Sequence, residues 1–196
     1  HSFGQKAQVA LDEAREKVAD FLGCSPEEVI FTDSATEANN LVIQGVQGVS
    51  SSHIHIITSQ IEHPAVLEPC RVLEKQGVEV TYLPVNREGL VKVSDVKKAI
   101  KPNTVLVSIM YANNEIGTIQ PIPEIAKILP PNIYFHTDAV QAANWLDCNV
   151  NNLGVDLLTL SGHKIYGPKG IGALYVRKNT RVQPLIYGGG HEFGLR

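Results

Sequence analysis

The chain has 196 residues, of which 43% are hydrophobic and 19% charged, and this composition is typical of a soluble globular protein with a substantial core. A formal net charge of -3 gives no reason to expect binding to nucleic acid or to an anionic membrane, and no apolar run approaches the roughly 20 residues that span a bilayer. The three cysteines, Cys24, Cys70 and Cys148, are odd in number and far apart, which argues against a disulfide framework and a CxxC zinc site and favours a reducing compartment.

Two helices are predicted in the N-terminal part of the chain. Residues 5–22 carry apolar side chains at close to a 3.6-residue period, which predicts an amphipathic helix. A second helix is predicted to begin near Ser34 or Thr36, both of which are capping candidates, and to run to about Gln47. The small residues at 48–52 then predict a loop.

Strand and helix signals alternate along the rest of the chain. Strands are predicted at residues 29–32, 53–59, 78–85, 104–111, 133–137, 155–161 and 172–177, and helices at residues 64–76, 93–100 and 121–129. Several strands are continuously apolar, as strands buried on both faces of a parallel sheet are. The alternation therefore predicts a three-layer α/β domain with a mostly parallel sheet of about seven strands and crossover helices.

Polar residues gather at the ends of five predicted strands, which is where open α/β sheets bind ligands. They lie in the segments Asp33-Ser-Ala-Thr36, Gln60-Ile-Glu-His63, Ala112-Asn-Asn-Glu115, Asp138-Ala-Val-Gln141 and Ser161-Gly-His-Lys164. Each segment alone is more simply a turn or a cap, but together they predict a pocket. The motifs GxGxxG, GxxxxGK[ST], HExxH and GxSxG are absent, which argues against standard nucleotide binding, zinc hydrolysis and serine hydrolysis.

Lys164 is the candidate for covalent chemistry. It follows an apolar strand and is flanked by glycines, so we expect it to be poorly hydrated, and poor hydration lowers the pKa of an ammonium group. A neutral amine can form a Schiff base with an aldehyde. An ordinary lysine in a surface hairpin is the simpler interpretation of this stretch alone. A carboxylate such as Asp138 nearby would favour pyridoxal phosphate, whose ring nitrogen and aldehyde call for such a pair.

Six motifs, in this order, resemble the cysteine desulfurases of the NifS/IscS-like group in the class-V aminotransferase family. They are Ala35-Thr-Glu-Ala-Asn-Asn40, Glu62-His-Pro-Ala-Val66, Asn113-Asn-Glu-Ile-Gly117, His136-Thr-Asp-Ala-Val-Gln141, Ser161-Gly-His-Lys-Ile-Tyr-Gly-Pro-Lys-Gly170 and Gly188-Gly-Gly-His-Glu192. The resemblance runs from about residue 30 to the last residue and implies the fold of a fold-type-I pyridoxal phosphate enzyme.

The resemblance also implies roles for nine residues. Lys164 would hold the cofactor as a Schiff base and later move protons, and His63 would stack on the ring and also handle protons. Asp138 would pair with the ring nitrogen. The other six would bind the phenolic oxygen, namely Asn114 and Gln141, or the phosphate end, namely Ala35, Thr36, Ser161 and His163. Thr36 would do so at a helix N-terminus, where a mere N-cap is the alternative.

Other residues are assigned no role at the cofactor. Family members usually have Gly where Ser34 stands, and Ser is acceptable there only with a negative φ. The acidic residues Asp33, Glu62 and Glu115 are interpreted as structural, the histidines His53, His55 and His136 as core or surface residues, and the three cysteines as outside the reaction.

Full-length relatives in this group convert L-cysteine to L-alanine and pass the sulfur, as a persulfide, to scaffold or acceptor proteins for iron–sulfur clusters and other cofactors. The resemblance therefore implies a homodimeric, pyridoxal phosphate-dependent cysteine desulfurase with no metal. A cytoplasmic location is expected, with an organellar leader left open because the sequence does not begin with Met.

Residues 1–196 would be the large domain of this enzyme, cut at both ends, without the small domain and the nucleophilic cysteine, and therefore inactive alone. Two alternatives stay open. One is another class-V enzyme, such as a selenocysteine lyase or an aminotransferase. The other is a non-catalytic fragment that only folds or binds a partner.

Overall fold

The computed structural model describes residues 2–46 and 53–196, so the predicted loop at 48–52 and the predicted helix end at Gln47 lie outside the described residues. The helices are α1 (Ser2–Leu22), α2 (Ala35–Gly45), α3 (Pro64–Lys75), α4 (Val93–Ala99), α5 (Ile122–Ile128), α6 (Val150–Leu153) and α7 (His191–Gly194), with short 3₁₀ helices at Pro26–Glu28 and Gly162–Lys164. The strands are β1 (Val29–Thr32), β2 (His55–Ser59), β3 (Glu79–Leu83), β4 (Thr104–Ser108), β5 (Tyr134–Asp138), β6 (Leu157–Ser161) and β7 (Gly172–Val176).

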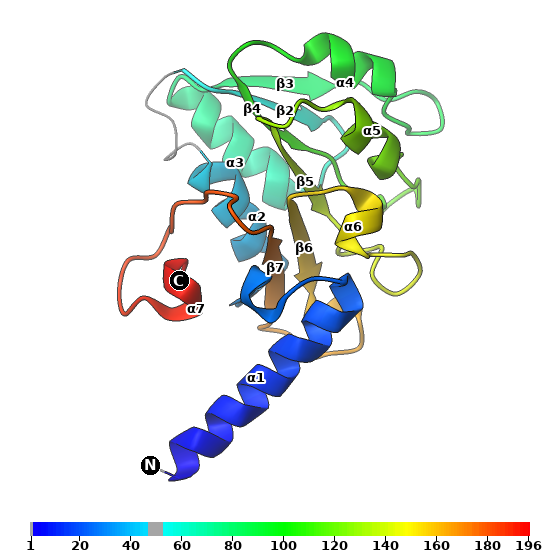
Figure 1. Ribbon diagram of the computed structural model, residues 1–196. Coiled ribbons are helices and arrows are strands. Elements are labelled where there is room, and N and C mark those ends of the chain that lie inside the picture. The colour runs from blue at the N-terminus through cyan, green and yellow to red at the C-terminus, as the bar shows by residue number, and fades with distance from the viewer. Residues whose placement is uncertain (1, 47–52) are drawn as a thin grey trace.

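The seven strands form one sheet in the order β1-β7-β6-β5-β4-β2-β3 (Figure 1). Only β7 is antiparallel to its neighbours, because it returns directly from β6 and pairs with β1 on its other side. The remaining pairings are parallel. The prediction of a mostly parallel, seven-stranded α/β sheet is therefore confirmed. The short helices α6 and α7 are not among the elements predicted from the sequence.

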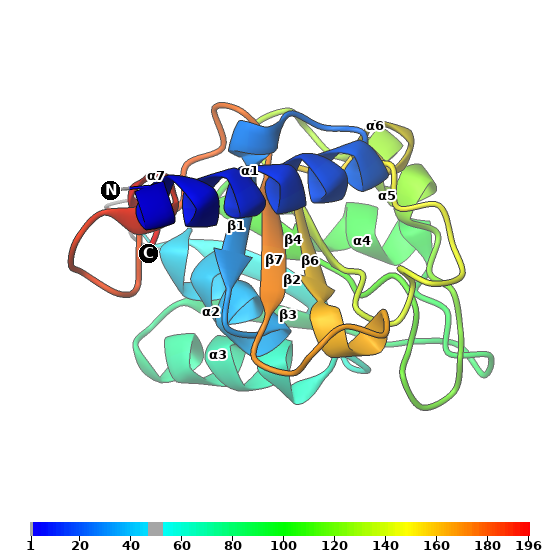
Figure 2. The ribbon, with the colours of Figure 1, turned by 90° about the horizontal axis from the view of Figure 1, so that it is seen from below.

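Hydrophobic residues fill both faces of the sheet and make three layers. One cluster packs α2 and α3 on one face, with Ile30, Leu106 and Leu157 pointing toward these helices. The other packs the end of α1 with α4, α5 and α6 on the opposite face, where Val107 and Leu158 point (Figure 2). Successive strand residues thus contribute to opposite clusters, as the two-residue period of a strand requires.

The direction of the strands places the predicted polar segments at one edge. β1, β2, β4, β5 and β6 all run the same way, so their C-terminal ends lie together. All five residues of β2 and of β6 are buried, and the chain becomes polar only where each strand ends. The core therefore anchors the strands rigidly and leaves their ends to carry chemistry.

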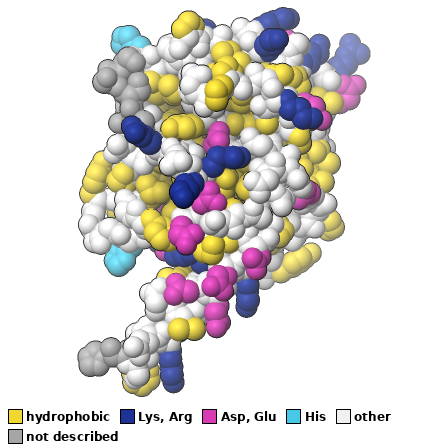
Figure 3. All heavy atoms as spheres, viewed as in Figure 1, with side chains coloured by type: hydrophobic (Ala, Val, Ile, Leu, Met, Phe, Trp, Pro, Cys, Tyr) yellow, Lys and Arg dark blue, Asp and Glu magenta, His cyan; other side chains and the backbone are white. Residues whose placement is uncertain are grey.

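The amphipathic pattern of α1 correctly predicts a helix, but not its burial. Only Arg15, Ala19 and Leu22 are buried, whereas Val9 and Phe3 are exposed. The helix extends beyond the sheet, so its first turns have no layer of described residues to pack against (Figure 1). Acidic side chains gather where it leaves the body of the molecule (Figure 3). No helix in the described part of the chain is both long enough and apolar enough to cross a membrane.

The C-terminal segment is tied back to the first helix and strand. The Arg15 guanidinium lies between the rings of Phe31 and Phe193 and pairs with the Glu192 carboxylate, with Nη1 2.7 Å from Oε2. Glu192 also accepts a hydrogen bond from the Phe31 amide at 2.8 Å, and Arg15 donates to the Val29 carbonyl. A largely buried ion pair with this many hydrogen bonds fixes the segment in place.

Candidate active site

The N-terminus of α2 faces the edge where the strands end. Ser34 is its N-cap, and the Ser34 hydroxyl accepts a hydrogen bond from the Glu37 amide at 3.1 Å. Thr36 lies inside the first turn, so the alternative that Thr36 is merely the cap is wrong. Ser34 has a φ of -167°, an extended conformation that any residue adopts, so a serine is acceptable at this position.

β7 brings the sheet against this helix N-terminus. A Cβ atom added to Gly172 would lie 2.6 Å from the Ser34 carbonyl carbon and 2.9 Å from the Ala35 nitrogen. No side chain fits in that space, so only glycine allows β7 to pack directly on the turn that begins α2. The free N–H groups and the positive end of the helix dipole are thereby held over the strand ends, where they favour an anion.

Asp138, the last residue of β5, is buried with 6% of its surface exposed. Its Oδ1 accepts a hydrogen bond from the Val140 amide at 3.0 Å, and its Oδ2 accepts one from the Asn39 side-chain amide at 2.7 Å. Burial raises the pKa of the Asp138 carboxyl, while these two donors and the nearby His63 lower it. Each oxygen keeps an unused lone pair, so the carboxylate can still accept a hydrogen bond from a ligand.

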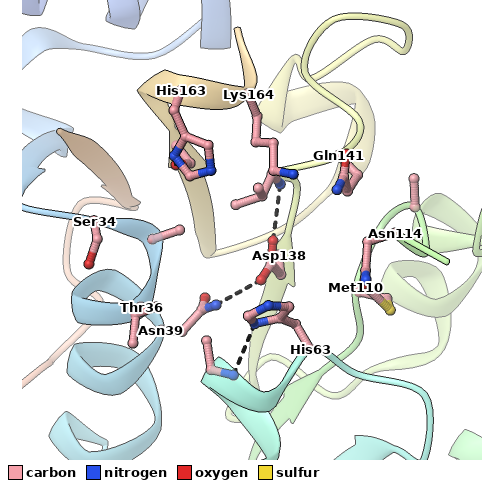
Figure 4. Close-up of a pocket in the computed structure, with 15 residues that line it drawn as sticks. Ser34, Thr36, Asn39, His63, Met110, Asn114, Asp138, Gln141, His163 and Lys164 are labelled. Atoms are coloured by element: carbon pink, nitrogen blue, oxygen red, sulfur yellow. Dashed lines mark hydrogen bonds between the residues drawn. The ribbon is translucent and has the colours of Figure 1, made fainter. Parts of the chain in front are cut away.

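His63 is the N-cap of α3, and its ring lies on the same side of the view as Asn39, near Asp138 (Figure 4). Its Nδ1 accepts a hydrogen bond from the Ala65 amide at 3.0 Å. In the neutral ring this contact leaves Nε2 to carry the proton, so the backbone selects one tautomer. The side chain is exposed and lines the cavity, and a flat ligand can pack against its face.

Lys164 does not have the environment expected from the sequence. It is exposed, because β6 ends at Ser161 and the lysine lies on the 3₁₀ turn that follows, outside the sheet. The predicted poor hydration of the lysine is therefore wrong, although its side chain does point into the cavity (Figure 4). In the same turn, the Ser161 hydroxyl and the His163 Nδ1 are 2.8 Å apart.

Asn114 and Gln141 approach from the loops after β4 and β5. The buried side chain of Asn113 holds the first loop, because its amide donates to the Ile61 carbonyl at 2.9 Å and its oxygen accepts from the Glu115 amide at 2.9 Å. Asn114 is consequently presented toward the cavity from a fixed turn. Gln141 follows Asp138 by three residues and is half-buried.

All nine residues predicted to bind the cofactor line a single cavity of about 150 Å³ (Figure 4). They are Ala35, Thr36, His63, Asn114, Asp138, Gln141, Ser161, His163 and Lys164. The cavity is also lined by residues that were given no role at the cofactor, namely Ser34, Asn39, Ala65, Met110, Ala112 and Val140. Among the described contacts, Asn39 is the only one of these six whose side chain hydrogen-bonds to a predicted site residue.

Glu62, for which the sequence predicts a structural role, is buried and does not line the cavity. Its Oε1 accepts hydrogen bonds from the Ser59 hydroxyl at 2.5 Å and the Met110 amide at 2.9 Å, and so joins the ends of β2 and β4. Its Oε2 is buried and has no partner among the described residues. Burial raises the pKa of Glu62 to about 8. These contacts support a structural role, filled by an acid that is protonated over much of the neutral range.

His55, His136 and the three cysteines do not line the cavity. His55 and His136 are buried and hydrogen-bonded to threonine or serine hydroxyls on neighbouring strands, and burial lowers the pKa of His136 to about 3. Burial raises the pKa of Cys24 to about 11 and of Cys70 and Cys148 to about 12. No group of three or more His, Cys, Asp or Glu residues in the described ranges could hold a metal ion.

Comparison with known proteins identifies the family. The family model of class-V aminotransferases matches residues 1–194. The chain belongs to the class-V aminotransferase family. Enzymes of this family depend on pyridoxal phosphate. The chain is 57% identical over 198 residues to the cysteine desulfurase IscS of Dictyoglomus turgidum and 48% identical over 200 residues to the cysteine desulfurase of Homo sapiens.

Solved structures of the family have the same fold. The chain superposes on a structure named "SspA in complex with cysteine" with a TM-score of 0.96 at 49% identity, and on a NifS-like protein with a TM-score of 0.97 at 43% identity. These matches cover all of this chain and 58% and 55% of the two solved chains. The chain likewise spans 50% and 44% of the two curated relatives, about half of their length.

Proposed function

We propose that residues 1–196 form the pyridoxal phosphate-binding large domain of a cysteine desulfurase. One observation carries this proposal: a lysine amine, a buried carboxylate and the N-terminus of a helix line the same cavity, in a chain 57% identical to a cysteine desulfurase. The whole protein would convert L-cysteine to L-alanine. It would pass the sulfur, as a persulfide, to acceptor proteins for iron–sulfur clusters and other sulfur-containing cofactors.

The donors and acceptors of the cavity fit pyridoxal phosphate. Lys164 supplies the amine that would bind the aldehyde carbon, and Asp138 supplies an acceptor for a protonated ring nitrogen. His63 offers a flat face for the ring. Asn114 and Gln141 would donate to the phenolic oxygen. The phosphate would lie at the start of α2, near Ala35, Thr36, Ser161 and His163.

Once bound, the cofactor would draw electron density away from the Cα–H bond of the amino acid attached to it. The residues of this chain then have to orient that bond and move its proton. Lys164 has a flexible side chain of four methylenes. Its amine can therefore reach the Cα proton after it releases the cofactor carbon. His63 is suited to a second proton transfer at Nε2, since Nδ1 is held by the Ala65 amide.

None of the three cysteines is suited to accept the sulfur. The thiolate is the nucleophilic form of cysteine, and burial keeps the pKa of all three thiols well above neutral pH. None of them lines the cavity. We therefore expect residues 1–196 to bind the cofactor but not to release alanine in repeated turnovers.

The proposal includes a homodimer. Ile116, Ile119 and Trp145 lie beside the cavity and are at least half exposed, which is unusual for a free surface. A second copy of the whole protein would cover this region. If the whole protein sediments as a monomer at tens of micromolar, roughly the range of weak association, the proposed homodimer is contradicted. Two other curated relatives are named mitosomal and mitochondrial cysteine desulfurases, so the proposed cytoplasmic location leaves an organellar one open.

Borohydride trapping tests the proposal. The protein is mixed with pyridoxal phosphate, reduced and mapped by peptide mass spectrometry, and the label is expected on Lys164. Lys164→Ala should remove it. The matched control is Lys169→Ala, because Lys169 is an exposed lysine of the same loop and does not line the cavity. Label spread over many lysines, or retained in the Lys164→Ala protein, would reject the site.

A further inference from the structure

Asn39 is a fully buried amide in the middle of α2, and its side chain reaches the Asp138 carboxylate (Figure 4). Its Nδ2 donates to Asp138 Oδ2 at 2.7 Å. Its own Oδ1 is buried and has no partner among the described residues. Leaving a buried carbonyl unpaired is unfavourable, typically by about 1–3 kcal/mol. The placement of Asn39 is therefore explained by its hydrogen bond to Asp138 and not by the pairing of its own amide.

The chemistry of the contact decides which way the amide faces. The Nδ2 group can only donate and the Oδ1 atom can only accept. A carboxylate oxygen requires a donor, so the alternative orientation would place two acceptors against each other. The contact also favours an unprotonated Oδ2, because a charged carboxylate oxygen accepts a hydrogen bond more strongly than the oxygens of a neutral acid. Asn39 therefore favours the charged form of Asp138, which burial alone disfavours.

The position of Asn39 on α2 links two ends of the cavity. Ala35 and Asn39 are four residues apart, so they lie on the same face of the helix, one turn apart, and both line the cavity. The start of α2 faces the region proposed to hold the phosphate, and Asn39 faces the carboxylate proposed to meet the ring nitrogen. A single rigid element thus sets the separation of the two contacts.

We propose that Asn39 is a positioning residue that keeps the Asp138 carboxylate charged and oriented toward the ring nitrogen of bound pyridoxal phosphate. This inference rests on the proposed function. The other charged or titratable groups near Asp138 are His63, from the start of α3, Glu62, from the loop after β2, and Lys164, from the turn after β6. None of these donates a hydrogen bond to Asp138, so Asn39 is the side chain that holds it.

The test isolates the part of the binding free energy that comes from the contact between Asp138 and the ring nitrogen. Dissociation constants are measured for pyridoxal phosphate and for its analogue in which CH replaces the ring nitrogen. The wild-type protein should prefer pyridoxal phosphate. Asn39→Leu, which has a similar volume, and Asn39→Ser, which is smaller, should both reduce this preference by about tenfold or more, the usual effect of a hydrogen bond to a charged group.

Asn40→Leu is the matched control, because Asn40 is the next residue, and its amide donates to the Thr36 carbonyl and lies outside the cavity lining. It should leave the preference unchanged. Circular dichroism establishes that each variant is folded. If a folded Asn39 variant binds both ligands more weakly by the same factor, or keeps the wild-type preference, Asn39 only fills space and the inference fails.

A measurement on the protein without cofactor makes the test independent of the variants. The carboxyl-carbon resonance of Asp138 in the wild-type protein should report a charged group at pH 7, and a neutral group would overturn the inference. The proposed function fails in a different way, namely if the wild-type protein does not bind pyridoxal phosphate at Lys164 at all.

Discussion

Two buried carboxyl groups lie close together at the strand ends, and their hydrogen bonds are arranged differently. Asp138, at the end of β5, receives one donor on each oxygen, from the Val140 amide and from Asn39. Glu62, just after β2, receives both of its donors on Oε1, and its Oε2 has none among the described residues. Asp138 lines the cavity, whereas Glu62 does not.

The two arrangements favour different charge states at nearly equal burial. Burial raises the pKa of both groups, and two hydrogen-bond donors oppose that effect in each. In Asp138 the donors lie on both oxygens, an arrangement that fits a charged carboxylate. The bare Oε2 of Glu62 fits a proton instead. A neutral Glu62 joins two loops without bringing a second negative charge beside Asp138.

The largest effect is expected from the proton on Glu62. The pKa of Glu62 is about 8 in the folded protein against an ordinary value of 4.5, so the folded state binds the proton more tightly than the unfolded state. Its contribution to stability is complete below pH 4.5 and is lost as the pH rises toward 8, by up to about 1.4 kcal/mol per pH unit. Glu62→Gln, which cannot ionise, should lack this slope in urea unfolding measured from pH 5 to pH 9.

The comparison of profiles isolates this group. Wild-type and Glu62→Gln proteins should have similar stability at pH 5, because the Gln oxygen can accept the same two hydrogen bonds as the protonated acid. The variant should be the more stable protein at pH 9. Glu115→Gln removes a negative charge from an exposed side chain and is the control. Parallel wild-type and Glu62→Gln profiles would mean that Glu62 is charged when buried.

The next effect concerns the charge on Asp138. Asp138→Ala should weaken the binding of pyridoxal phosphate by about 2–3 kcal/mol, the usual value of a buried hydrogen bond between charged groups, which corresponds to about a hundredfold in Kd. The fold should persist, since the variant also removes a carboxylate that is unfavourably buried. Absorbance titration measures the affinity and urea unfolding the stability. Loss of the fold with no separate change in affinity would make Asp138 a structural cap.

Much of the fold could be predicted from local patterns. Continuous apolar runs located β2 and β6 because these strands are buried on both faces, and the alternation with helices indicated a parallel sheet. The strand order could not be predicted, because it depends on which helices pack together. The extent to which α1 is buried could not be predicted for a similar reason. An amphipathic pattern states which face could be buried, but not whether another element reaches it.

The candidate site was predictable where one motif carries both the residue and its backbone turn, as for Asp138 and Gln141. It was less predictable where distant segments meet. The signal for Asn39 was its position one helical turn after Ala35. The raised pKa of Glu62 depends on burial of its carboxyl between the ends of β2 and β4, and Met110, just after β4, is 48 residues away in sequence. The hydration of Lys164 was misjudged because the strand before it ends three residues earlier.

The smallest effect should come from Ser59, which donates to Glu62 Oε1 and is fully buried. Ser59→Ala should lower the free energy of unfolding by about 1 kcal/mol at pH 5, the net value of an ordinary hydrogen bond. The loss should be larger at pH 9, because a hydroxyl stabilises a charged carboxylate more than a neutral acid. Thr58→Val is the matched control, since the Thr58 hydroxyl donates to a neutral carbonyl, that of Ser108, at 2.9 Å. Thr58→Val should change the free energy of unfolding by the same amount at pH 5 and pH 9. If Ser59→Ala also has the same effect at both pH values, Glu62 keeps one charge state between pH 5 and pH 9.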